Sequence, residues 1–224
     1  MAIQQYTSQW SGYTYYASPT DSFSGNNLEY RHHNGMLVAH IMQGFGWSNN
    51  AIAGILGNMV LESTINPGVM ENHVEWTETG GFGLTQWTKA RKYYDWADMM
   101  GYLPYHDIEY QCERIRLELT DSAYDQYYPT SEFWIPMYEF VVSEKSPYWL
   151  ACAFAWNYER SKVVLEGTAA QKEKLMRNRG SQANVWYKYI TGEEAPDTGD
   201  LPSFKDPRKG MSKLLLYAVG SDIV

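Results

Sequence analysis

Apolar residues recur at helical spacing in the first half of the chain and predict two amphipathic helices. One stripe consists of Leu37, Val38, Ile41, Met42 and Phe45, and the next of Ile52, Ile55, Leu56, Met59 and Val60. Ser48, a preferred N-cap residue, precedes the second stripe, and Asn66-Pro67 ends it. Spacings of three and four residues place each stripe on one helix face, so we expect both helices to pack on a common core.

Start and stop signals predict further helices in the rest of the chain. One helix is expected over residues 88–100 and another along the apolar stripe of residues 108–119. Ser146-Pro147 is a favourable cap and first position for a buried helix that reaches residue 158. Thr168 and Gln171 have the spacing of a capping box, which predicts a long helix ending near residue 190.

The remaining segments lack helical periodicity and define the expected organisation. Residues 1–33 are polar and rich in Tyr, Ser, Gly and Asn, which predicts an arm or an irregular cap before a main domain at residues 34–190. Within that domain, residues 63–87 are expected to form an irregular or β-hairpin lobe. Residues 191–224 are predicted to be a linker or extended strap followed by a tail, whose apolar run at 214–219 docks on the domain or on a partner. The expected fold is therefore mainly α with one small lobe, an N-terminal arm and a C-terminal extension.

Composition narrows the possible classes of function. The chain has 224 residues, of which 44% are hydrophobic, enough for a sizeable core. A formal net charge of −8 argues against a broadly basic nucleic-acid binder. No segment reaches the length of a membrane span, and the N-terminus lacks the pattern of a signal peptide.

The cysteines and histidines of the chain do not indicate a metal site or a redox site. Cys112 and Cys152 are expected to be two buried thiols, with a disulfide as the alternative. The five histidines do not stand at metal-site spacing from cysteines or carboxylates, so we expect no metal and no cofactor.

Glu62 is the candidate with the most chemical content. It lies i+7 from Ile55 and i+3 from Met59, so it shares their apolar face and is expected to point toward the core. Burial on such a face disfavours the charged form of a carboxyl group and raises its pKa. A carboxylic acid that stays protonated near neutral pH can act as a general acid. An ordinary solvated carboxylate at a helix end is the alternative.

Two further motifs follow Glu62-Ser63 in the chain. They are Gly80-Gly81-Phe82-Gly83-Leu84-Thr85-Gln86-Trp87 and Ala155-Trp156-Asn157-Tyr158-Glu159-Arg160. Together with Glu62, these motifs resemble the lysozyme-like superfamily of goose-type lysozymes and lytic transglycosylases, and more closely the phage tail lysozyme family, over about residues 35–190. The resemblance implies an α-rich lysozyme-like fold. It also implies cleavage of peptidoglycan at the β-1,4 link after N-acetylmuramic acid, with Glu62 as the acid.

Residues within these motifs form the candidate substrate-binding set, namely Phe82, Gln86, Trp87, Trp156 and Tyr158. Aromatic rings can pack on the C–H faces of sugars, and the amide of Gln86 can hydrogen-bond an N-acetyl or hydroxyl group. Tyr158 is included because lytic transglycosylases carry a comparable tyrosine near their catalytic glutamate. Core packing of the rings and closure of the turn by Gln86 are the alternatives. Glu159 and Arg160 are expected to form a structural ion pair or to line the cleft.

Glycoside hydrolysis usually requires a second carboxylate, about 5–5.5 Å from the first for retention and about 6.5–9.5 Å for inversion. Glu71, Glu75 and Glu78 are the nearby choices in sequence, and Glu78, closest to the Gly-rich turn, is the predicted partner of Glu62. Some members of the superfamily manage with one glutamate because the N-acetyl group of the substrate assists. A lytic transglycosylase that uses Glu62 is one alternative function. A virion structural protein with an inactive, glycan-binding lysozyme-like module is the other.

The expected location is the virion tail. The acidic charge gives no general attraction to an anionic wall, and both ends of the chain have the composition of contact segments. Together with the missing export signal, these features predict a tail-tip lysin that opens the wall for DNA entry. Its expected partners are peptidoglycan glycan strands and phage tail proteins. A lysin released late in infection and admitted to the wall by a holin is the alternative.

Overall fold

The computed structural model of the chain describes residues 2–124, 126–199 and 201–204. Its helices are α1 (Leu28–Gly44), α2 (Asn49–Glu62), α3 (Arg91–Met100), α4 (Ile108–Thr120), α5 (Met137–Phe140), α6 (Pro147–Phe154), α7 (Lys162–Glu166) and α8 (Ala169–Thr191). Single turns occur at η1 (Gly25–Asn27), η2 (Glu71–His73), η3 (Ser122–Tyr124) and η4 (Ala155–Glu159), of which η4 is π-helical. Two short strands, β1 (Gln4–Thr7) and β2 (Thr14–Ala17), pair antiparallel. This architecture confirms the prediction of a mainly α fold, and its small hairpin lies at the N-terminus.

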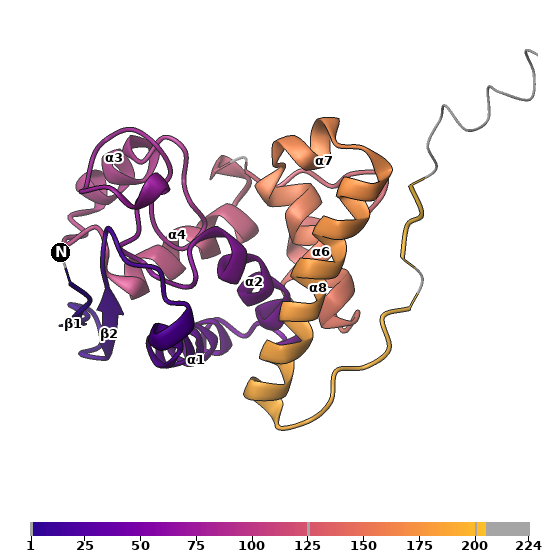
Figure 1. Ribbon diagram of the computed structural model, residues 1–224, viewed down its shortest axis with the longest axis horizontal. Helices are drawn as coiled ribbons and strands as arrows, with labels where there is room; N and C mark the ends of the chain where they lie inside the picture. The colour runs from indigo at the N-terminus through magenta and orange to yellow at the C-terminus, as the bar shows by residue number, and fades with distance from the viewer. Residues whose placement is uncertain (1, 125, 200, 205–224) are drawn as a thin grey trace, which may run out of the picture.

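Helix α2 forms the centre of the molecule. Figure 1 shows it between the hairpin, α1, α3 and α4 on one side and α6, α7 and α8 on the other. Its residues from Asn50 to Val60 are all buried, and it contacts both α6 and α8. The helix is apolar nearly all round, which is the pattern of a helix enclosed by its neighbours.

Two glycines explain how closely α6 and α8 approach α2. A Cβ atom at Gly54 would lie 2.9 Å from the backbone nitrogen of Ala151 in α6. A Cβ atom at Gly57 would lie 2.7 Å from the backbone nitrogen of Ala183 and from the carbonyl oxygen of Arg179, both in α8. Any larger residue would push these helices apart, so the two glycines set the distance between the parts that carry the site.

The caps read from the sequence are confirmed. The side chain of Ser48 accepts a hydrogen bond from Ala51 N at the start of α2, and Ser146 caps α6 in the same way, with Pro147 in the first turn. The capping box of Thr168 and Gln171 is complete at the start of α8. Two starts differ from the prediction, because α1 already begins at residue 28 and α3 begins only at residue 91.

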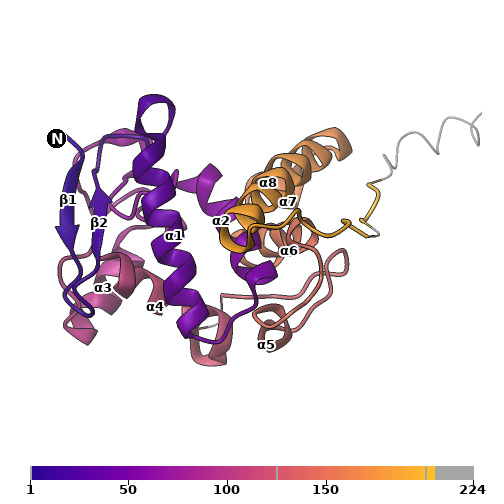
Figure 2. The same ribbon diagram turned by 90° about the horizontal axis from the view of Figure 1, so that it is seen from below.

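The N-terminal segment packs on the body of the protein. Tyr15 of β2 is fully buried in the core. In the β1–β2 turn, the Ser8 hydroxyl donates to the carboxylates of Asp107 and Glu109 at the start of α4, the former at 2.9 Å. Figure 2 shows the hairpin beside α1. The boundary at residue 33 stays a prediction, but the described part of this segment is not a free arm.

The segment at residues 63–87 is irregular. Apart from one isolated β-bridge between Met70 and Phe82, the described residues of this segment contain no strand pairing. A hairpin within this segment, one of the two expected forms, is therefore wrong, since the hairpin lies at residues 4–17. The other form, an irregular lobe, holds.

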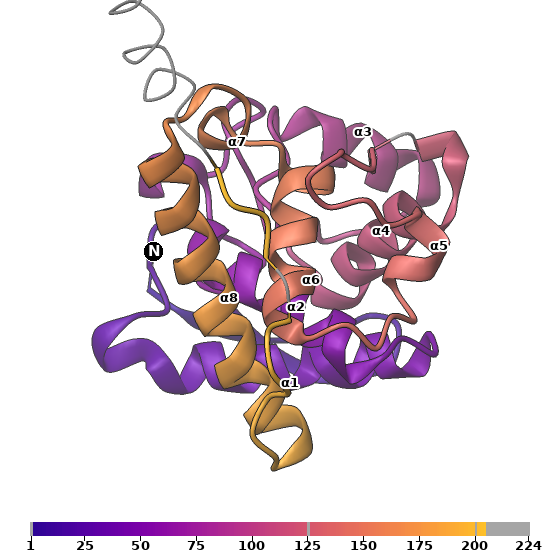
Figure 3. The same ribbon diagram turned by 90° about the vertical axis from the view of Figure 1, so that its right-hand side faces the viewer.

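Residues 193–199 and 201–204 run back over the domain as an extended strap (Figure 3). The carbonyl of Thr198 accepts a hydrogen bond from the Ser146 hydroxyl, and the ring of Phe204 stacks on Trp156 with centroids 5.5 Å apart. The apolar run at residues 214–219 lies outside the described residues.

Candidate functional site

Glu62 is the last residue of α2, and its position is fixed by the residue that follows it. The Ser63 hydroxyl bonds to the carbonyl oxygens of Met59 at 3.1 Å and of Leu84 at 2.8 Å. This contact joins the end of α2 to the Gly-rich turn. The side chain of Glu62 retains 23% of its exposure, so its carboxyl group reaches solvent at the edge of the core.

The partner of Glu62 is Arg179, a buried residue of α8. One terminal nitrogen of Arg179, Nη2, donates to Glu62 Oε1, and the other, Nη1, donates to Asn58 Oδ1 at 2.8 Å. Asn58 is itself fixed, because its amide donates to the carbonyl oxygens of Gly54 and Ala151 at 2.9 Å each. No motif in the sequence points to this partner, since 117 positions separate the two charged residues. A guanidinium beside a carboxyl group favours the ionised form, which opposes the desolvation expected from the apolar helix face.

Glu159, in η4, is a second carboxyl group near Arg179. Its Oε1 atom is buried and accepts no hydrogen bond from the described residues. Burial raises the pKa of Glu159 well above its usual value; the charges of Glu62 and Glu118 add to the shift, and Arg179 opposes it. The expected pairing with Arg160 is not what the structure shows, because the Arg160 guanidinium lies over the ring of Tyr128, 4.9 Å from its centroid.

Gln86 closes the Gly-rich turn, which is the alternative to substrate binding that the sequence left open. Its backbone has a φ of 53°, and its amide Nε2 donates to Gly83 O at 3.1 Å and to Val69 O at 3.3 Å. Gly83 is required in the same turn, since its φ is 75° and a Cβ atom there would lie 2.6 Å from Gln111 Oε1. Gln86 remains partly exposed, so contact with a substrate stays a prediction.

The four aromatic candidates are buried in this structure. Trp87 donates from Nε1 to Glu118 Oε2 at 3.0 Å, and the Tyr158 hydroxyl donates to the same oxygen. Phe82 is packed against two tyrosines of α3, and Trp156 is covered by Phe204. The rings therefore support the site from within, and a role in contacting sugar remains untested.

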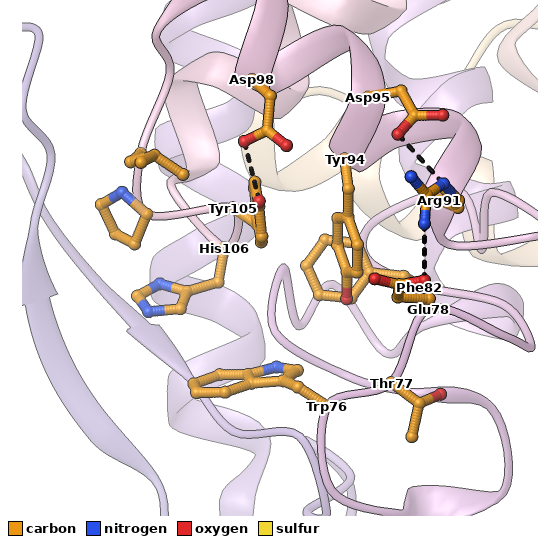
Figure 4. A pocket seen from close by; sticks show the side chains of 12 residues that line it. Trp76, Thr77, Glu78, Phe82, Arg91, Tyr94, Asp95, Asp98, Tyr105 and His106 are labelled. Atoms are coloured by element: carbon orange, nitrogen blue, oxygen red, sulfur yellow. Dashed lines mark hydrogen bonds and ion pairs between the residues drawn. The ribbon is translucent and has the colours of Figure 1, made fainter.

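Glu78 lies in a different part of the molecule from Glu62. It forms an ion pair with Arg91 of α3 at 2.7 Å, and both side chains are largely exposed. The two residues belong to a pocket of about 580 Å³, shown in Figure 4, whose lining includes Phe82 but not Glu62. The structure thus does not bring the two predicted carboxylates into one site.

The walls of this pocket are aromatic. Trp76, 40% exposed, stacks on His106 with centroids 5.3 Å apart, and Tyr94 stacks on Tyr105 at 4.3 Å. Asp98 accepts a hydrogen bond from the Tyr105 hydroxyl at 2.8 Å. Burial lowers the pKa of His106 to about 4, so its ring is neutral near pH 7. Trp76 is an aromatic residue that the sequence reasoning missed, because it stands in a loop outside the recognised motifs.

Other sequence-based expectations can be compared directly. Cys112 and Cys152 are both buried free thiols. Within the described ranges, no group of three or more His, Cys, Asp or Glu residues is placed to hold a metal ion. No helix among those residues has the length and apolar character needed to cross a membrane.

The fold and the motif geometry agree with comparisons to known proteins. Residues 33–190 match the phage tail lysozyme family, and the chain belongs to that family. Among curated proteins, it is 38% identical over 165 residues to Morphogenesis protein 1 of Bacillus phage B103. The match covers 71% of this chain but only 40% of that relative.

Proposed function

We propose that the protein is a muramidase that cuts the β-1,4 link between N-acetylmuramic acid and N-acetylglucosamine in peptidoglycan. The observation that carries this proposal is the placement of Glu62, which ends a buried helix, reaches solvent and is held at one oxygen by Arg179. A carboxyl group fixed in this way has a defined direction for proton transfer, which general acid catalysis requires. Membership of the phage tail lysozyme family supports the same reaction.

In the proposed reaction, Glu62 donates a proton to the glycosidic oxygen as the C–O bond breaks. Water then attacks the muramic acid carbon, and its proton returns to the Glu62 carboxylate. Because Glu78 pairs with Arg91 in a pocket that excludes Glu62, we propose that the N-acetyl group of the substrate replaces the second carboxylate. A lytic transglycosylase differs in one step, since a hydroxyl of the muramic acid itself takes the place of water and an anhydro sugar is released.

The aromatic pocket can bind sugars of the glycan strand that lie away from the cleaved bond. The exposed face of Trp76, stacked on the neutral ring of His106, suits the C–H face of a pyranose ring. Asp98, already oriented by Tyr105, can accept hydrogen bonds from sugar hydroxyl groups. We assign this pocket to outer sugars of the glycan strand, with Glu78 and Phe82 as parts of its lining.

A second candidate function is a virion structural module without catalytic activity. The name of the relative, Morphogenesis protein 1, and the burial of the four aromatic candidates favour it. Under either function we propose that the protein acts in the virion tail with other tail proteins as partners, as its family suggests. As a muramidase there, it would open the wall for DNA entry.

Digestion of purified peptidoglycan followed by mass spectrometry separates these functions. Reducing muropeptides indicate a hydrolase, anhydro-muropeptides a transglycosylase, and unchanged walls a structural module. Glu62→Gln removes the proton and keeps the shape of the side chain, so we expect a rate lower by about 10²–10⁴. Cleavage by this variant at the wild-type rate contradicts the assignment of Glu62.

A further inference from the structure

Two buried polar atoms next to Glu62 have no hydrogen-bond partner among the described residues. One is Nε of Arg179, whose terminal nitrogens bind Asn58 and Glu62, and the other is Oε1 of Glu159. Buried polar groups nearly always have a hydrogen-bond partner in folded proteins, and a buried donor or acceptor without one destabilises the fold by about 1–3 kcal/mol. The charge of Arg179 acts on Glu159, so a donor and an acceptor that both lack a partner belong to one charged cluster.

Arg179 is a single positive charge that acts on two carboxyl groups. It can neutralise only one of them fully, and in the structure that one is Glu62. The other, Glu159, is buried, and a buried carboxyl without a counterion holds its proton. The arrangement shown is therefore one of two that have the same total charge.

We infer that Glu159 is a positioning residue for the proposed cleavage, because Arg179 exchanges its ion pair between Glu62 and Glu159, and the carboxyl left unpaired carries the proton. The inference rests on the proposed role of Glu62 as the acid. In the second arrangement, Arg179 donates from Nε to Glu159 Oε1, so the two atoms that lack a hydrogen-bond partner bind each other. Glu62 is then released as a carboxylic acid at the solvent edge.

The exchange conserves protons and charge. Glu159 loses a proton and becomes a carboxylate that pairs with Arg179, while Glu62 gains a proton and becomes neutral. This removes the conflict between the ion pair seen at Glu62 and the protonated form that a general acid needs. The same proton then passes from Glu62 to the glycosidic oxygen.

The remaining charged group that faces Glu159 does not compete for Arg179. Glu118, from α4, receives hydrogen bonds from Arg114 Nε at 2.8 Å, from Trp87 Nε1 at 3.0 Å and from the Tyr158 hydroxyl. Its charge raises the pKa of Glu159 in both arrangements, and so does that of Glu62 when ionised. Glu118 therefore takes no part in the exchange, and its charge favours the arrangement in which Glu159 carries the proton.

Carboxyl ¹³C NMR of the folded protein tests this directly. With labelled glutamate, and signals assigned from Glu62→Gln and Glu159→Gln, we expect both carboxyl groups to titrate in two steps at shared pH values. In Glu159→Gln, the Glu62 signal should lose its second step, because Arg179 then pairs with Glu62 alone. Independent single steps in the wild type, or an unchanged Glu62 curve in the variant, overturn the inference.

Activity gives a second readout that a merely structural role of Glu159 would not produce. We expect Glu159→Gln to keep its rate in acid and to lose about tenfold at neutral pH, because the alkaline limb of kcat moves to lower pH. Equal loss at every pH contradicts the exchange. Glu109→Gln, which removes another buried carboxyl at the N-terminal hairpin, is the matched control and should leave the limb in place. If the wild type does not cleave walls, the proposed function fails, whereas the NMR titration still decides the exchange. If Glu159→Gln does not fold, the wild-type signal of Glu62, assigned from Glu62→Gln, still shows whether the titration has one step or two.

Discussion

Replacing Arg179 by Met tests how strongly the ion-pair cluster stabilises the fold. The substitution keeps an unbranched side chain in place but removes the guanidinium that donates to Asn58 and Glu62. Asn58 is fully buried, so its Oδ1 atom loses a charged donor and gains no water. A hydrogen bond to a charged group contributes about 1.5–3 kcal/mol, and breaking a buried pair costs about 3–5 kcal/mol.

Glu62 reduces this cost, because its carboxyl is partly solvated and can be hydrated after the change. Glu159 adds little to it, because this buried carboxyl holds its proton in the arrangement shown. We therefore expect the free energy of unfolding to fall by about 3–4 kcal/mol, near the middle of these ranges.

Urea unfolding followed by far-ultraviolet circular dichroism measures this loss, provided that the slope against urea is unchanged. Arg177→Met is the matched control, since Arg177 is an exposed residue of the same helix, and we expect a change within about 0.5 kcal/mol. A loss below about 1 kcal/mol for Arg179→Met refutes the reasoning. Such a small loss would mean that the cluster contributes no more to the free energy of unfolding than a surface ion pair does.

Two further predictions concern the aromatic pocket. Trp76→Ala should raise KM for glycan strands several-fold and leave kcat nearly unchanged, because the ring is assigned to outer sugars. Trp10 is another exposed tryptophan, so Trp10→Ala is the control. An equal rise in KM in both variants contradicts the assignment. Folding lowers the pKa of His106 from about 6.5 to about 4, so its neutral form stabilises the native state fully above pH 6.5, and this contribution is lost as pH falls through 4. His106→Gln should therefore reduce the fall in unfolding free energy between pH 7 and pH 4 by about 2–4 kcal/mol, and urea titrations with the same pH dependence as wild type would contradict this.

Local signals made most of the fold predictable. The caps at Ser48, Ser146 and Thr168 use hydrogen bonds within a few residues of themselves, so the sequence contains all the information needed to place them. The early start of α1 was missed because residues 28–36 are polar on the exposed side and show little apolar periodicity. The N-terminal hairpin was missed because its stability comes from contacts with α4, which lies about a hundred positions later.

The site was predictable only in part. Glu62 and its turn were found because a helix end and a Gly-rich loop are recognisable motifs. Arg179 was not found, since a single arginine in a long helix does not differ from its exposed neighbours until the fold places it against Asn58. The aromatic candidates show the opposite error, because proximity in sequence to a motif does not determine whether a ring such as Trp156 faces solvent or the core.

The distance in sequence between Glu62 and Arg179 has a consequence during synthesis. The Gly-rich turn and α2 are complete long before α8 has been made, so a growing chain carries Glu62 without its cation. Only when α8 docks against Gly57 does the guanidinium enter the core and fix the carboxyl. The site around Glu62 therefore reaches the geometry described above only after α8 has packed on α2.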